Sequence, residues 1–173
     1  MRRPAWLTWG RFFDVLALLV IGFVLWKVFF APRILKADAF PAPRIAYPHL
    51  NDHGVFHVAD ARGHVLFLEF FESWCEPCGL EAPLVTHYAR AHPEIDVVPV
   101  DIAEPPVLAR RFADRYHLRN VALDTTGTAR ALFQVDGTPT IVVIDPLGRI
   151  RATWAGFNPA VELAMGNAET MLR

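Results

Sequence analysis

Short apolar runs recur along residues 45–173 and are separated by polar or amphipathic stretches. Three of them, at residues 65–71, 95–100 and 140–145, are almost continuously apolar. Runs of this length and composition are typical of strands that are buried on both faces, as in sheets covered by helices. The pattern therefore predicts three central strands inside a layered domain.

Between these strands, the spacing of apolar residues changes to that of helices. A helical pattern covers about residues 75–92, and residues 106–117 place Leu108, Phe112 and Tyr116 on one face. The remaining predicted elements are a hairpin at 45–64, a weak strand at 120–124, a short helix at 126–133, an antiparallel strand at 149–154 and a closing helix at 159–172. This order predicts an α/β fold, with a mixed β-sheet flanked by helices.

Residues 12–31 are apolar except for two charged residues, Asp14 and Lys27, which lie near the ends of the stretch. As a helix it would extend roughly 30 Å, enough to cross a bilayer. We therefore expect a short tail (1–11), a transmembrane anchor (12–31), a tether (32–44) and one domain (45–173). A cleavable signal peptide that ends near Ala39 and a buried helix of a soluble protein are the alternatives.

Charge excludes one class of partner. Residues 31–173 carry 13 Lys and Arg against 17 Asp and Glu, without a basic stripe. This balance gives no electrostatic footprint for nucleic acid, so we expect no nucleic-acid partner. Basic residues lie in similar numbers on the two sides of the apolar stretch, so the positive-inside rule leaves its orientation open.

The two cysteines of the chain, Cys75 and Cys78, follow the first predicted central strand at the point where a helix is expected to begin. In the first turn of a helix, residues three apart share a face and lie close enough for a disulfide. The amides and partial positive charge of the helix N-terminus would stabilise a thiolate on Cys75. Pro77 suits this turn, because the first N–H groups of a helix lack an intrahelical partner.

This context favours a redox-active pair over two other interpretations. A static disulfide would close so small a loop that it would stabilise the fold little. A zinc site needs four ligands, and the chain has no second cysteine pair.

The segment EFFESWCEPCGLEAP resembles the thioredoxin superfamily, and within it the membrane-anchored thiol–disulfide oxidoreductases of the TlpA/ResA type. The resemblance covers about residues 40–173. Its further marks are Trp74 before the first cysteine, Pro83 five residues after the second, the segment Gly137-Thr138-Pro139-Thr140 and the turn Asp145-Pro146-Leu147-Gly148. The Cys-Glu-Pro-Cys sequence and Glu81 are similar to the cytochrome c maturation reductases in particular.

The resemblance implies a thioredoxin-like fold, thiol–disulfide exchange through Cys75 and Cys78, and a cis peptide bond at Pro139 that places the Thr138 backbone beside Cys75. We expect contacts with the client from Trp74, Pro77, Thr138 and Pro139. The implied partners are cysteine-containing client proteins and a membrane thiol-transfer protein that donates electrons, with no cofactor and no metal. The implied location is the bacterial inner membrane, as a single-pass protein whose domain faces the periplasm or another extracytoplasmic space.

Four glutamates lie close to the cysteines in sequence. Glu69 falls inside an apolar strand, where an unpaired carboxylate is costly, so we expect it to be partly protonated or hydrogen-bonded and to relay a proton. The alternative is a strand-end side chain that reaches solvent. Glu81 follows Cys78 by one helical turn and is either an active-site acid on the cysteine face or a charge that favours the helix dipole. Glu72 and Glu76 are interpreted as solvated surface charges.

Nearby negative charge disfavours a thiolate, so these acids should raise the pKa of Cys75 and lower the reduction potential of the pair. We therefore expect a dithiol that reduces client disulfides. The alternatives are a disulfide-forming oxidase on the same fold, a copper-handling module that would use His49, His53 and His57, and a redox-inert, membrane-tethered interaction domain.

Overall fold

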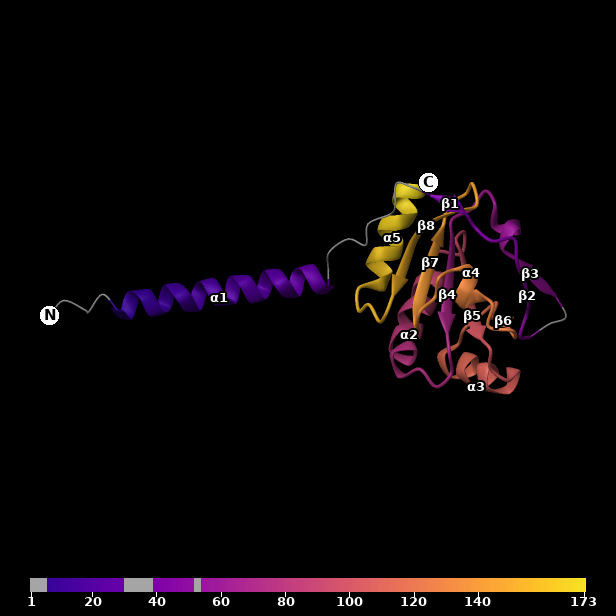
Figure 1. Cartoon of the computed structure of the whole chain (residues 1–173), viewed down its shortest axis with the longest axis horizontal. Coiled ribbons are helices and arrows are strands. Elements are labelled where there is room, and N and C mark those ends of the chain that lie inside the picture. The colour runs from indigo at the N-terminus through magenta and orange to yellow at the C-terminus, as the bar shows by residue number, and fades with distance from the viewer. Residues whose placement is uncertain (1–5, 30–38, 52–53) are drawn as a thin grey trace. The chain divides into compact units, whose positions relative to one another are not determined.

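The computed structural model describes residues 6–29, 39–51 and 54–173, and within the first helix it describes side chains over residues 11–23 only. These residues divide into an N-terminal helix and an α/β domain, both drawn in Figure 1. The remaining parts of the expected tail, anchor and tether lie outside the described residues.

Helix α1 (Trp6–Phe29) is continuous over 24 residues. Its described side chains are exposed, and large apolar ones such as Phe12, Leu18 and Phe23 are among them. Within the part of the chain that the structure describes, no helix is both long enough and apolar enough to cross a membrane.

A six-stranded mixed sheet forms the centre of the domain. Its strands are β1 (Phe40–Pro41), β4 (Leu66–Phe71), β5 (Asp96–Ile102), β6 (Ala122–Asp124), β7 (Thr140–Ile144) and β8 (Arg149–Ala155). Their spatial order is β1–β8–β7–β4–β5–β6. β4 is parallel to β5 and antiparallel to β7, β5 is parallel to β6, and β8 is antiparallel to both β7 and β1.

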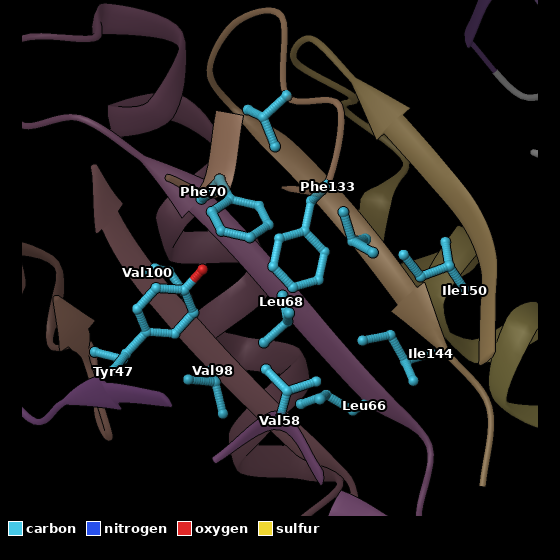
Figure 2. Packing of buried hydrophobic residues seen from close by; sticks show 14 of the residues in the cluster. Tyr47, Val58, Leu66, Leu68, Phe70, Val98, Val100, Phe133, Ile144 and Ile150 are labelled. Atoms are coloured by element: carbon cyan, nitrogen blue, oxygen red, sulfur yellow. The ribbon is translucent and has the colours of Figure 1, made fainter. Parts of the chain in front are cut away.

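Side chains alternate between the two faces of a strand, so every second residue of β4 lies on the same face of the sheet. One of these faces carries the largest hydrophobic cluster of the domain. Leu66, Leu68 and Phe70 of β4 pack here with Tyr47 and Phe133 (Figure 2), and the ring centroids of Phe70 and Phe133 are 5.3 Å apart. A small hairpin and two short helices contribute to this cluster, namely β2 (Ala46–Pro48), β3 (Val55–His57), η1 (Val58–Ala61) and α4 (Ala129–Leu132).

The other three positions of β4, Phe67, Glu69 and Phe71, point to the opposite face. Three helices pack on that face, namely α2 (Glu76–Ala91), α3 (Pro106–Tyr116) and α5 (Val161–Leu172). Glu69 therefore lies on the face of the sheet that the helices cover, beneath α2, the helix that follows the cysteine loop.

The structure confirms the α/β class, the three central strands and the antiparallel pairing of the last two strands. The hairpin is shorter than expected, because β3 ends at His57 and η1 replaces its continuation; residues 52–53 of the expected turn lie outside the described residues. Phe40–Pro41, in the segment expected to be a tether, form β1 and pair with residues 149–150 of β8.

Candidate active site

Cys75 lies beyond the end of β4 and caps the N-terminus of α2. Its Sγ accepts a hydrogen bond from the backbone N–H of Cys78 at 3.2 Å, which satisfies one of the donors that the first turn of a helix leaves unpaired. The two sulfurs form a disulfide of 2.08 Å, with the Cα atoms 5.3 Å apart. The predicted placement of the pair on the first turn of a helix is confirmed.

The two cysteines differ in accessibility. Cys75 retains 5% exposure, whereas Cys78 retains none and packs with Phe71, Ala82 and side chains of α3. Trp74, directly before the pair, is 72% exposed, as expected for a surface residue. Cys75 is therefore the more exposed of the two cysteines and the one that an incoming sulfur would reach first.

The peptide bond between Thr138 and Pro139 is cis, as the resemblance implied. The backbone N–H of Gly156 donates to the Pro139 carbonyl at 2.8 Å, and the Thr138 hydroxyl donates to Oε2 of Glu72 at 2.8 Å. Because Glu72 precedes Cys75 in the same loop, the second hydrogen bond joins the proline loop to the cysteine loop. Of the four residues expected to contact a client, Trp74 and Pro77 are exposed, Thr138 is half-buried and Pro139 is buried.

The interpretation of Glu72 as a solvated surface charge is wrong. The residue is 6% exposed, and its Oε1 accepts a charge-assisted hydrogen bond from Nη2 of Arg130 at 2.6 Å. A carboxylate can be buried at this position because two donors and an opposing charge replace the solvent. Glu76, which was interpreted in the same way, is exposed as expected.

Glu69 is 1% exposed, and its Oε2 has no hydrogen-bond partner among the described residues. Burial, and then the negative charge of Glu81, raise the pKa of Glu69 well above the ordinary value of a carboxyl. The alternative of a side chain that reaches solvent is wrong, and the raised pKa has the direction expected for a partly protonated acid. The proton-relay role stays a prediction.

Glu81 is 2% exposed and lies beyond the first turn of α2. Its Oε2 accepts a hydrogen bond from the backbone N–H of Asn158 at 2.7 Å, which ties α2 to the loop between β8 and α5. Its charge also acts on Glu69. The two carboxyls thus belong to one buried layer beneath the helix that bears the cysteines, and Glu81 is not merely an exposed charge at a helix end.

A second acidic pair on this face is absent from the sequence-based prediction. Asp101 pairs with Phe71 across β5 and β4 and is 1% exposed. Burial, a hydrogen bond with Glu104, and the charges of Glu104 and Glu72 raise the pKa of Asp101 to about 8. Glu104 accepts hydrogen bonds from the backbone N–H and the hydroxyl of Ser73, the latter at 2.7 Å. The predicted strand at 95–100 ended one residue before Asp101, whereas β5 continues to Ile102, so the signal that singled out Glu69 missed this acid.

The described histidines give the copper alternative no support. In the described ranges, the side chains close enough to share a cation are His92, Glu94 and Glu169, and Arg173 forms salt bridges with both of these carboxylates. His49 and His57 do not belong to this group, and His53 lies outside the described residues.

A disulfide on the first turn of a helix that follows a central strand, together with a cis-proline loop, defines the thiol–disulfide oxidoreductases of the thioredoxin fold. Residues 36–172 match the family model described as Redoxin, and the chain belongs to the Redoxin family. The site and the family together make it a thiol–disulfide oxidoreductase of the ResA/TlpA type.

The curated relatives that the chain resembles include several with the name thiol-disulfide oxidoreductase ResA. That of Geobacillus kaustophilus (strain HTA426) is 26% identical over 142 residues, which cover 80% of this chain and 81% of the relative. That of Bacillus subtilis (strain 168) is 25% identical over 133 residues, which cover 75% of this chain and 74% of the relative.

Solved structures agree with the fold. A putative thiol:disulfide interchange protein DsbE from Chlorobium tepidum superposes with a TM-score of 0.71 at 28% identity, covering 79% of this chain and 99% of that one. The MTB dsbF structure, in mixed oxidised and reduced forms, has a TM-score of 0.67 at 28% identity, covering 76% and 99%.

Proposed function

We propose that the chain is a reductase whose Cys75–Cys78 dithiol donates electrons to disulfides of extracytoplasmic client proteins. The observation that carries the proposal is the pair of buried carboxyls, Glu69 and Glu81, beneath the helix that bears the cysteines. Negative charge in this layer opposes a thiolate, and a dithiol whose thiolate is not stabilised gives up its electrons more readily.

The reduction consists of two exchange steps. The Cys75 thiolate attacks one sulfur of the client disulfide; a bond forms between Cys75 and the client, and the client's other sulfur leaves as a thiolate. The Cys78 thiolate then attacks Sγ of Cys75, and the second client sulfur leaves. The client gains two electrons and two protons, and the dithiol loses them as its disulfide forms.

Cys78 must lose its proton before the second step, and it is fully buried. In our proposal, the ionised form of Glu69 accepts that proton. The raised pKa of Glu69 brings its proton affinity closer to that of a thiol, which makes the transfer more balanced than it would be for an ordinary carboxyl. Glu81 assists because its charge raises the proton affinity of Glu69.

The location belongs to the same proposal. We place residues 12–31 in the bacterial inner membrane as an anchor, with the domain on the periplasmic or other extracytoplasmic side; the apolar sequence and the resemblance to membrane-anchored oxidoreductases support this. A membrane thiol-transfer protein would re-reduce the pair. Apocytochrome c is a candidate client, because the Cys-Glu-Pro-Cys sequence and Glu81 resemble the cytochrome c maturation reductases.

Equilibration of the full-length protein in detergent with glutathione buffers tests the direction of electron flow. We expect a reduction potential nearer to about −270 mV than to about −120 mV. Glu81→Gln removes a buried charge and should raise the potential by about 20 mV, which corresponds to about 1 kcal/mol. Asp60→Asn, which removes an exposed charge from η1 on the other face of the sheet, should leave the potential unchanged. A wild-type potential near about −120 mV would identify an oxidase instead.

A further inference from the structure

Glu72 contacts both loops of the active site. Its backbone carbonyl accepts a hydrogen bond from the N–H of Cys75 at 3.1 Å. Its Oε2 accepts one from the Thr138 hydroxyl at 2.8 Å, and its Oε1 accepts one from Arg130 at 2.6 Å. A single buried residue therefore connects the accessible cysteine to the residue that precedes the cis proline.

We propose that Glu72 is a positioning residue, which fixes Thr138 relative to Cys75 so that the Thr138 backbone can pair with an extended client segment. The client's sulfur would then meet Cys75 in a reproducible geometry. The inference rests on the proposed function in one respect, namely that a cysteine-containing polypeptide binds at this loop.

The surroundings of Glu72 suit a residue that holds Thr138 in position rather than one that transfers protons. Both carboxylate oxygens accept hydrogen bonds, one of them from a guanidinium, so two donors and an opposing charge hold the group in place. Arg130 compensates the buried charge, while its own side chain keeps 42% exposure. Glu72 can thus remain a charged acceptor for the Thr138 hydroxyl without adding an uncompensated negative charge beside Cys75.

A merely structural salt bridge would behave differently. Its loss would affect folding, or the reactivity of Cys75 toward every disulfide alike. Loss of positioning should instead affect only substrates that have a backbone to pair with Thr138. The size of the substrate therefore distinguishes the two roles.

The test compares two disulfides with the reduced, full-length protein in detergent. One is a peptide cyclised by a disulfide, and the other is bis(2-hydroxyethyl) disulfide, which has no peptide backbone. Thr138→Val keeps the shape and removes the hydroxyl. We expect kcat/KM for the peptide to fall about tenfold, mainly through KM, and that for the small disulfide to change less than about twofold. Thr138→Ser restores the hydroxyl and should restore most of the peptide rate.

Glu72→Ala should reproduce this selective loss. The double variant with Thr138→Val should lose no more than either single variant, because both changes remove the same hydrogen bond. Asp60→Asn is the control, since it removes an exposed carboxylate from η1 on the other face of the sheet; it should leave both substrates unaffected. If Glu72→Ala does not fold, Thr138→Val and Thr138→Ser decide the question.

Equal losses with both disulfides, additive losses in the double variant, or an unaffected Thr138→Val would overturn the inference. The same comparison is made with the oxidised protein and the peptide dithiol. A chain that oxidises the dithiol but does not reduce the disulfide contradicts the reductase proposal. If the variants slowed the oxidation of the peptide dithiol selectively, the role of Glu72 would still be supported. Failure of the reductase proposal and failure of the Glu72 inference are therefore distinguishable.

Discussion

A carboxyl group that is buried in an apolar layer, with one oxygen lacking a partner, costs folding free energy. Glu69 is such a group, and proteins retain such groups mainly where the group has a use. Its raised pKa affects stability whether or not it relays a proton, so it can be tested without a client.

Glu69→Gln should stabilise the oxidised protein increasingly as pH rises. In the wild type, the unfolded chain ionises Glu69 near the ordinary pKa of about 4.5, whereas the folded state keeps the proton to higher pH. Between these two pKa values the folded state binds more protons, so its stability falls with rising pH by about 1.4 kcal/mol per unit. Gln removes this loss. Urea unfolding at pH 5 and pH 8 measures the difference.

The difference between variant and wild type isolates Glu69, because Asp101, whose pKa is also raised, is present in both proteins. Glu76→Gln serves as a control and should show no such trend. If Glu69→Gln differs from the wild type by the same amount at both pH values, Glu69 ionises normally in the folded protein.

Cys78→Ala should accumulate mixed disulfides, because the first exchange needs only the accessible Cys75 and the second needs the buried Cys78. Non-reducing gels of membranes, followed by mass spectrometry, would detect the attached clients. Cys75→Ala should accumulate far fewer adducts. Similar amounts from both variants would contradict the assignment of the first attack to Cys75.

At the scale of elements, the contact between α2 and α3 depends on Gly79. A Cβ at this position would lie 2.5 Å from the hydroxyl of Tyr116, whose ring packs against Phe112 with centroids 4.6 Å apart. The absence of a side chain at Gly79 therefore allows α3 to pack against the helix that carries the cysteines.

Gly79→Ala should destabilise the protein by about 1–2 kcal/mol, because the steric cost exceeds the gain of about 1 kcal/mol in helix propensity. In a Tyr116→Phe background, where the hydroxyl is gone, the same change should be neutral or stabilising. Denaturant unfolding of the four proteins measures both effects. An equal cost in both backgrounds would mean that the hydroxyl is not the obstacle.

Elements with continuous apolar runs could be predicted from sequence almost to the residue. The run at 65–71 became β4 (Leu66–Phe71), since burial on both faces leaves a pattern that few other structures share. β1 could not be predicted. A strand of two residues has no period, and both of its residues are exposed, so its formation depends on the edge that β8 offers.

The same distinction holds within the site. The cysteine pair could be placed from local spacing, and Pro139 from its motif. The burial of Glu72 was not predicted, because the charged residues close to it in sequence are all acidic and offer no partner. Its partner Arg130 lies 58 residues further along the chain. The fold, which brings α4 to the end of β4, determines that pairing, and no local pattern encodes it.

At the scale of the whole molecule, the helix and the domain are separate units. Every residue of the candidate site lies in the domain, between Glu69 and Asn158. The proposed function assigns location to the first unit and chemistry to the second, so the two properties should be separable.

Removal of residues 1–31 should move the protein from the membrane pellet to the soluble fraction and leave its reduction potential unchanged. The full-length chain should stay in the pellet after alkaline carbonate extraction, as a span of roughly 20 apolar residues would. A full-length chain in the supernatant would contradict the anchor. A changed potential in the shortened protein would show that the first unit influences the site.

The unequal burial of the two sulfurs also suits the protein to quantitative labelling in native vesicles. In the reduced protein, a bulky maleimide should modify the accessible thiol, while the packing of α3 shields the other. Each reduced chain should then gain the mass of one adduct, and an oxidised chain none. The relative amounts of labelled and unlabelled chains would report the redox occupancy of the population without purification.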